Sequence, residues 1–372
     1  MRIGVPAETR AGETRVAATP ETVKKLAAKN AVRIQAGAGA GANFPDAEYQ
    51  KAGAGIAGSP AEAFDADIVL KVRSPQENEL QYLKADCTLI GLLEPFNSAG
   101  LEAIARTGVN GFAMEALPRI SRAQPMDVLS SQANIAGYKA VVLAAAEIGR
   151  FFPMLMTAAG TVKAARVLIL GAGVAGLQAI ATAKRLGAVV EASDVRPAVK
   201  EQIESLGAKF LDVPYLTDEE RQIAEGAGGY ARPMPADWMR RQGELVHARA
   251  AQSDIVITTA LIPGRPAPVL IDEETAKQMK PGSVLVDLAI EQGGNCPLSE
   301  KDKIVVKHGV KLIGFANLPA TVAADASALY ARNLLNFIGL MIDPQSGKFN
   351  LNREDEIVAG TLLCINGELV RK

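Results

Sequence analysis

The stretch "RVLILGAGVAGLQAIATAKRLGAVVEASD", residues 166–194, decides the fold of this 372-residue chain. It begins with an apolar run typical of a buried strand and passes through Gly171, Gly173 and Gly176 in the spacing GxGxxG. An alanine-rich segment typical of a helix follows, and a second apolar run ends at Asp194. Strand, glycine turn, helix and strand in this order predict the β-α-β unit of a dinucleotide-binding Rossmann domain.

Each glycine has a separate physical role in such a unit. Gly171 permits the tight turn after the strand, and Gly173 lets the backbone approach a pyrophosphate at the helix N-terminus. Gly176 permits close packing of the helix against the strand. Ala172 and Val174 complete the turn, which therefore predicts the phosphate end of a nucleotide site.

Asp194 indicates which nucleotide binds. A carboxylate at the end of the second strand accepts hydrogen bonds from the adenosine ribose hydroxyls, and its charge repels the 2′-phosphate of NADP(H). The sequence therefore favours NAD(H). Arg196 leaves two interpretations open: it holds a 2′-phosphate, or it pairs with Asp194 or packs over the adenine ring.

Short apolar runs alternate with helical patterns along the rest of the chain, which predicts parallel sheets covered by helices. Before the glycine turn, strands are expected at 2–8, 31–37, 67–72, 87–93 and 109–115. After it, strands are expected at 189–194, 210–213, 254–260, 283–289 and 310–317, and a linking helix is expected at about 134–150. The fold class is α/β, with two Rossmann-like doubly wound parallel-sheet domains, the second of which binds the dinucleotide.

The domain boundaries follow from where this rhythm restarts. We expect a discontinuous N-terminal Rossmann-like domain of residues 1–129 and 319–372, and an NAD(H)-binding Rossmann domain of residues 130–318. The tail carries Asn366-Gly367, a hairpin turn signal, and is expected to return to the first domain. The polar stretch 217–252 contains a glycine cluster and is expected to be a flexible lid.

Composition excludes several classes of protein. Net charge is −1, with 40 basic and 41 acidic residues, which argues against nucleic acid as a partner. The three cysteines, Cys87, Cys296 and Cys364, are far apart and argue against a disulfide framework and a metal site. The first residues lack the apolar core of a signal peptide, and no apolar run approaches the ~20 residues that span a bilayer. We expect a protein that is soluble by itself, in a reducing compartment.

A second signature is "PRISRAQPMDVLSSQANIAGY", residues 118–138, which is rich in hydrogen-bonding side chains but has no histidine or cysteine. Together with the glycine turn, "GGYA", "TTALIPGRPAPVLI" and "VDLAIEQGGNCPLSE", it closely resembles the NAD(H)-binding component (domain I, alpha subunit) of proton-translocating NAD(P)+ transhydrogenases. The resemblance covers essentially the whole chain. Alanine dehydrogenase is a more distant relative.

The resemblance implies an enzyme that is active only with a partner subunit: an NAD(P)+ transhydrogenase of the Si-specific/Re-specific type. NAD(H) bound here would pass a hydride directly to NADP+ on an NADP(H)-binding subunit, which regenerates NADPH. A membrane-spanning component would couple the transfer to proton translocation. The chain would then be cytoplasmic and peripheral on the inner membrane. Direct hydride transfer needs no acid or base, which explains the absence of histidine from the second signature.

The resemblance also implies roles for individual residues. The catalytic set, around the nicotinamide carboxamide and ribose, is Arg119, Gln124, Asp127, Ser130 and Tyr230. The cofactor-binding set comprises Arg119, Gln124, Asp127, Ser130, Gly171, Ala172, Gly173, Val174, Gly176, Asp194, Val195, Arg196, Gly229, Gln242 and Leu261. No metal ligand is expected.

Several of these residues have simpler alternative roles. Arg119 and Asp127 would form a salt bridge, Ser130 would be the N-cap of the linking helix, and Tyr230 would be an ordinary loop aromatic. Pro125 and Met126 depart from the family pattern, which suggests a stiffer loop after Gln124.

Residues outside the signatures are expected to be structural. We interpret Met154 and Met156 as packing residues, Cys296 as a buried thiol, and His247 and His308 as surface or core residues.

Two other functions stay open. Arg15 and Lys71 resemble the carboxylate-binding pair of alanine dehydrogenases, but Glu94 stands where those enzymes have a histidine. A sensor that binds NAD(H) without catalysis is the third possibility. Two-domain Rossmann enzymes commonly form symmetric dimers, and the linking helix is apolar nearly all round, so we also expect a homodimer.

Overall fold

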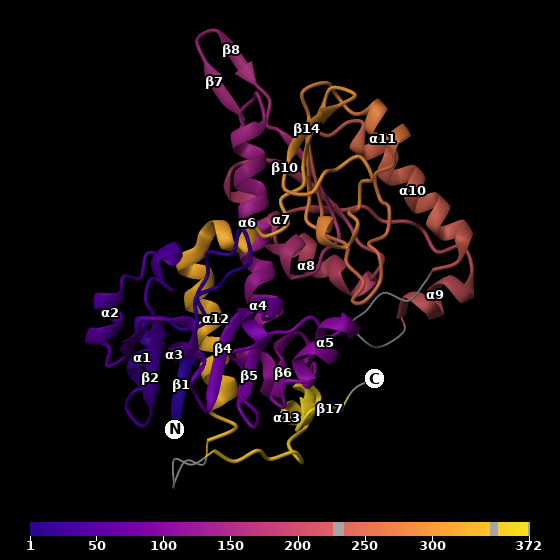
Figure 1. Cartoon of the computed structure of the whole chain (residues 1–372). Helices are drawn as coiled ribbons and strands as arrows, with labels where there is room; N and C mark the ends of the chain where they lie inside the picture. Colours follow the sequence, from indigo (N-terminus) through magenta and orange to yellow (C-terminus); the bar gives the residue numbers. More distant parts are fainter. Residues whose placement is uncertain (226–233, 343–348, 371–372) are drawn as a thin grey trace. The chain divides into compact units, whose positions relative to one another are not determined.

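A computed structural model describes residues 1–225, 234–342 and 349–370 of the chain. It divides into two compact units, the first comprising Met1–Gln132 with Pro319–Lys372 and the second comprising Ala133–Leu318. Each unit contains one open, mostly parallel sheet with helices around it (Figure 1). The predicted α/β class with two Rossmann-like sheets is confirmed.

The sheet of the first unit has the strand order β17-β16-β6-β5-β4-β1-β2-β3. Strands β1 to β6 are mutually parallel, and their order is that of a doubly wound sheet, whose direction of winding reverses between β1 and β4. The strands are β1 (Arg2–Val5), β2 (Ala31–Gln35), β3 (Gly55–Ala57), β4 (Ile68–Arg73), β5 (Thr88–Leu92), β6 (Asn110–Ala113), β16 (Leu362–Ile365) and β17 (Glu368–Leu369).

The C-terminal strands of this sheet are antiparallel additions. β16 pairs with β6, and β17 pairs with β16. Asn366 and Gly367 have φ of 50° and 85° in the turn between them, as an Asn-Gly hairpin requires.

The helices of the first unit start where their capping residues predict. Thr19 caps α1 (Pro20–Leu26) by accepting a hydrogen bond from the Thr22 amide. The others are α2 (Asp46–Lys51), α3 (Pro60–Phe64), α4 (Glu77–Leu80), α5 (Ser98–Ala105), α12 (Ala323–Ile338) and α13 (Glu356–Thr361). Tyr330 of α12 is fully buried and donates to the Lys71 carbonyl at 2.8 Å, which fixes α12 on the end of β4.

The sheet of the second unit has the order β11-β10-β9-β12-β13-β15-β14, and only β14 is antiparallel to its neighbour. The winding reverses between β9 and β12. The strands are β9 (Arg166–Leu170), β10 (Val189–Ser193), β11 (Lys209–Phe210), β12 (Ile255–Thr258), β13 (Val284–Asp287), β14 (Ile304–Lys307) and β15 (Val310–Ile313). The sequence interpretation missed β14, the edge strand.

Helices of the second unit are α7 (Val174–Arg185), α8 (Lys200–Ser205), α9 (Asp218–Glu225), α10 (Ala236–Ala250) and α11 (Glu273–Gln278). The stretch 217–252, expected to be a flexible lid, therefore contains two helices among its described residues. Helix α6 (Val128–Glu147) runs from the first unit into the second. It starts earlier than predicted.

A two-stranded hairpin follows α6. Strands β7 (Leu155–Thr157) and β8 (Gly160–Val162) are antiparallel, and all their residues are exposed. Figure 1 shows the hairpin projecting beyond the end of α6. The side chains of Met154 and Met156 are 59% and 73% exposed, so their interpretation as packing residues is wrong.

Candidate functional site

The glycine turn of the second unit lies between β9 and α7. Gly171 has φ of 96°, and a Cβ atom there would lie 2.6 Å from Thr259 Oγ1. A Cβ atom on Gly176 would overlap the carbonyl oxygen of Gly171. Both positions therefore require glycine for internal reasons, as the spacing predicts.

Gly173 differs from the other two glycines because its Cβ position is open, with no atom within 4 Å. It is the N-cap residue of α7 and offers no side chain to the first amides of that helix. Unpaired amides and the helix dipole attract an anion. The open space beside Gly173 therefore fits the pyrophosphate of a dinucleotide.

Asp194 follows β10 and is joined to the glycine turn. Its Oδ2 accepts hydrogen bonds from the Ala172 amide at 2.7 Å and from Arg196 Nη2 at 2.9 Å. Its Oδ1 accepts from the Arg196 amide at 2.8 Å and from Arg196 Nε at 2.9 Å. Hydrogen bonding to Asp194 raises the pKa of the Arg196 guanidinium. Of the two interpretations of Arg196, the structure shows the ion pair.

Residues after β12 close the other side of the turn. Thr259 Oγ1 donates to the Gly171 carbonyl at 3.0 Å. Asn295 holds the next residue from both sides: Oδ1 accepts from the Ala260 amide at 3.1 Å and Nδ2 donates to the Ala260 carbonyl at 2.9 Å. Leu261 comes next and is exposed. Thr259 and Asn295 were missed by sequence reasoning, although both lie in quoted signatures.

Asp287, at the end of β13, organises this loop from below. It is fully buried, and its carboxylate accepts hydrogen bonds from the Ala289, Asn295 and Cys296 amides at 3.0 to 3.1 Å. The position of Asn295, and through it that of Ala260, depends on this carboxylate.

The remaining residues of the second unit lie around the same strand ends. Gln242 of α10 is buried and donates to Ser193 Oγ at 3.4 Å, directly before Asp194. Val195 packs against a small cluster that contains Trp238, and Val174 is exposed. Parallel strands β9, β10, β12 and β13 end at one edge of the sheet, next to the point where the winding reverses. Ligands of doubly wound sheets bind at such an edge. Gly229 and Tyr230 lie outside the described residues.

In the first unit, Gln124 lies in a short 3-10 helix, Ser121–Met126, that is fixed on both sides. Arg122 makes a bidentate pair with Asp355 at 2.6 and 2.9 Å, and this bond lowers the pKa of Asp355. Asn333 and Asn336 of α12 both donate to the Pro125 carbonyl, at 2.7 and 3.0 Å. Gln124 itself is exposed between these anchors, on a stiff segment.

Asp127 and Ser130 are in direct contact at the start of α6. Asp127 Oδ1 accepts from the Ser130 amide at 2.9 Å, and Oδ2 accepts from the Ser130 hydroxyl at 2.5 Å. Asp127, immediately before the helix, therefore caps α6, and the interpretation of Ser130 as the N-cap is wrong. Arg119 is exposed upstream of the same segment.

Arg15 and Lys71 lie in a buried charge cluster of the first unit. Lys71 is fully buried, with Glu79 at 2.7 Å and Glu8 at 3.5 Å. Arg15 donates to both oxygens of Glu13, at 2.8 and 2.6 Å. Burial raises the pKa of Glu8, although Lys71 opposes that shift. Both cations already have carboxylate partners within the chain, which a substrate carboxylate would have to displace.

The remaining chemical groups have structural partners. His247 contacts Thr275 Oγ1 at 2.9 Å and Gln278 Oε1 at 2.8 Å, and His308 contacts Glu273 at 3.0 Å. Cys296 is buried, as predicted, and burial raises the pKa of its thiol. Within the described ranges, no group of histidine, cysteine or acidic side chains has the arrangement of a metal site. None of the described helices combines the length and the apolar character needed to cross a membrane.

Comparison with known proteins gives matches over both units. Models of the alanine dehydrogenase/PNT N-terminal and C-terminal domains match residues 4–136 and 140–372. The chain is 53% identical to an NAD(P) transhydrogenase alpha subunit of Rhodospirillum rubrum, over 100% of this chain and 98% of that one. A solved transhydrogenase structure from Sinorhizobium meliloti matches with a TM-score of 0.90 and 47% identity over 100% of both chains. A solved L-alanine dehydrogenase matches with a TM-score of 0.83 and 27% identity, over 100% of this chain and 97% of that one.

Proposed function

The chain belongs to the alanine dehydrogenase/PNT family, and from this premise we propose that it is the NAD(H)-binding component of a proton-translocating NAD(P)+ transhydrogenase. The observation that carries the proposal is the glycine turn with Asp194 beside it, at the edge of the second sheet where the winding reverses. Similarity to transhydrogenase alpha subunits over the full chain supports the same assignment.

Each part of the second unit's site has a role in holding the nucleotide. The first amides of α7, beside the open space at Gly173, hold the pyrophosphate. Asp194 accepts the hydroxyls of the adenosine ribose and disfavours a 2′-phosphate, which makes the site selective for NAD(H). Val174, Val195, Gln242 and Leu261 complete the site, with Gly229 of the segment outside the described residues.

The resemblance assigns the nicotinamide end to Arg119, Asp127 and Ser130, with Gln124 and Tyr230 near the reacting rings. A bound dihydronicotinamide supplies the hydride, and the acceptor is NADP+ on a partner subunit. Because a hydride transfer between two nicotinamides moves no substrate proton, these side chains orient and do not act as acids or bases. Their anchoring in the first unit suits that task.

The chain would act in an assembly. Its partners are an NADP(H)-binding subunit and a membrane-spanning proton channel, which would keep it peripheral on the cytoplasmic face of the inner membrane.

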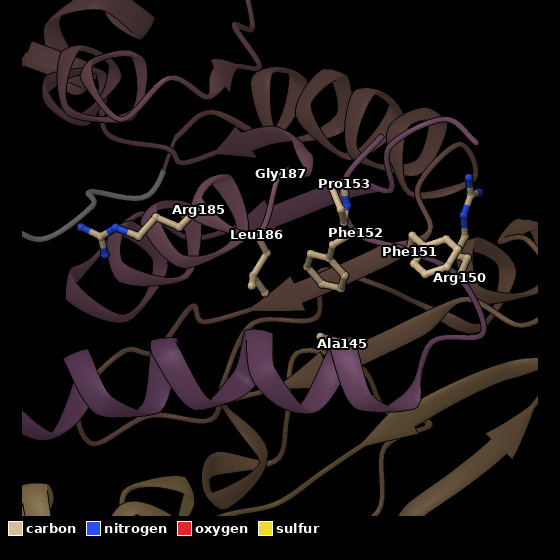
Figure 2. Close-up of a pocket in the computed structure, with 8 residues that line it drawn as sticks. All are labelled: Ala145, Arg150, Phe151, Phe152, Pro153, Arg185, Leu186 and Gly187. Atoms are coloured by element: carbon tan, nitrogen blue, oxygen red, sulfur yellow. The ribbon is translucent and has the colours of Figure 1, made fainter. Parts of the chain in front are cut away.

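We also propose a homodimer, and the second unit's surface supports it. The hairpin exposes Met154, Met156 and Val162. A hollow of about 560 Å³ lies beside its base and is lined by Ala145, Arg150, Phe151, Phe152, Pro153, Arg185, Leu186 and Gly187 (Figure 2). Exposed apolar surface of this kind marks a protein–protein contact.

An alanine dehydrogenase-like activity is the second candidate, because the match to a solved L-alanine dehydrogenase extends over the whole chain. Such an enzyme needs a cation to hold the substrate carboxylate and an acid or base beside the reacting carbon. Arg15 and Lys71 are paired with buried carboxylates, and Glu94 is paired with Arg10 at 2.5 Å. These contacts disfavour the second candidate.

Two assays decide between these functions. The purified chain is mixed with an NADP(H)-binding component from the same family, and hydride transfer from NADH to an NADP+ analogue is followed. The chain alone is then assayed with L-alanine and NAD+. Transfer in the first assay and no turnover in the second support the proposal. The reverse result would establish the dehydrogenase, and no activity in either, despite NADH binding, would favour a sensor.

A further inference from the structure

All acceptor positions of the Asp194 carboxylate are occupied within the chain. An ionised carboxylate offers about four lone-pair sites. Ala172 and Arg196 supply four donors between them: two backbone amides and the Nε and Nη2 groups of the guanidinium. The geometry is a bidentate arginine–carboxylate pair, which is among the stronger hydrogen-bonded arrangements in proteins.

This arrangement competes with the role proposed for Asp194. Ribose hydroxyls need acceptor sites on the same two oxygens. The two backbone amides are fixed by the glycine turn and by the chain itself, so they cannot withdraw without unfolding the loop. The Arg196 side chain is the movable donor: it is 29% exposed, whereas the Asp194 side chain is only 5% exposed.

Resting on the proposed function, we infer that the Arg196 guanidinium is an internal occupant of the ribose subsite, which NADH must displace to reach Asp194. Arg196 is thus a specificity-determining residue that lowers NADH affinity by stabilising the empty site. In the empty state it neutralises a nearly buried carboxylate, and in the bound state the ribose hydroxyls take over two of the acceptor sites.

The inference predicts an unusual sign for a substitution in a binding site. Arg196→Met removes the competitor but keeps a side chain of similar length, so NADH should bind about three- to ten-fold more tightly. The empty protein should also melt at a lower temperature, because Asp194 then keeps only its two amide donors. Arg240→Met is the matched control, because Arg240 pairs with Asp237 and Glu244 on the exposed face of α10.

Calorimetric titration with NADH and with reduced nicotinamide mononucleotide, which lacks the adenosine ribose, tests this. Tighter NADH binding, unchanged mononucleotide binding and a lower melting temperature of the empty Arg196→Met protein support the inference. NADH binding that is equal or weaker in Arg196→Met than in wild type overturns it, because Arg196 would then be neutral or would contact the nucleotide. If wild type itself binds no NADH, the proposed function fails instead.

Discussion

Gly137 of α6 and Ala175 of α7 touch backbone to backbone: a Cβ atom on Gly137 would overlap the carbonyl oxygen of Ala175. Ala175 lies in the first turn of α7, the turn that follows Gly173. The absence of a side chain at Gly137 thus determines how closely α6 approaches the helix end assigned to the pyrophosphate. The glycine in "ANIAGY" has a packing role that only the structure reveals.

We therefore expect Gly137→Ala to weaken NADH binding and lower the melting temperature. The added methyl group must push α7 away from α6, which moves the amides assigned to the pyrophosphate. Overpacking of this kind destabilises by roughly 1–3 kcal/mol. Thermal unfolding and NADH titration measure both effects. Gly149→Ala is the control just after the same helix, because a Cβ atom there has nothing within 4 Å. Equal effects of the two substitutions would contradict the steric argument.

The parts of this fold that the sequence predicts are those with a local cause. The glycine spacing, the Thr19 cap and the Asn366-Gly367 turn each depend on residues next to one another in the chain. Asp127 and Ser130 are both good caps, so the sequence could not decide which of them starts α6. The structure decides for Asp127 because its carboxylate reaches the Ser130 amide.

The parts that the sequence does not predict depend on distant contacts. Thr259 contacts the glycine turn across 88 positions of sequence, and Asn295 contacts Ala260 across 35. No local pattern records such pairs. The hairpin that carries Met156 was misread for a related reason: apolar residues usually indicate a core, and only the structure shows that these lie on the surface.

We expect Asp194→Ala to reduce the preference for NADH over NADPH. The carboxylate accepts the ribose hydroxyls of NADH and repels the 2′-phosphate of NADPH, so its removal should loosen NADH by roughly 10- to 100-fold, as the loss of a hydrogen bond to a charged group does. NADPH affinity should fall less or rise. Calorimetric titration of both nucleotides measures this, with Asp212→Ala as a control because Asp212 forms an exposed pair with Lys200. An unchanged affinity ratio would show that Asp194 does not read the ribose.

The homodimer is tested at the projecting hairpin. Met156→Asp places a charge on its most exposed apolar side chain, so it should shift the protein from dimer to monomer at micromolar concentration. Multi-angle light scattering gives the mass of each variant. Met239→Asp, on the 42% exposed Met239 of α10, is the matched control and should leave the dimer intact. A wild-type monomer would refute the dimer itself, and a dimer that survives Met156→Asp would exclude the hairpin as its contact.

The last prediction concerns Gln124, which the Arg122–Asp355 pair and the Pro125 carbonyl hold on a stiff segment. In direct hydride transfer the reacting carbons must approach to about 3–3.5 Å, so alignment determines the rate. Gln124→Asn keeps the amide but shortens its reach by one methylene group. NADH affinity should stay nearly unchanged, because the α7 amides and Asp194 hold the rest of the nucleotide.

Hydride transfer to partner-bound NADP+ should nonetheless slow by one to several powers of ten, at about 1.4 kcal/mol of barrier for each tenfold. Stopped-flow transfer rates measured at saturating NADH separate this effect from binding. Gln81→Asn is the control, because Gln81 is an exposed glutamine of the first unit whose amide donates to the nearby Asn78 carbonyl. A transfer rate that is unchanged, or that falls only in proportion to lost NADH affinity, would show that Gln124 does not align the two nucleotides. The stiff segment would then serve the packing of η3 (Ser121–Met126) against α12, which depends on Asn333 and Asn336 and not on the exposed glutamine.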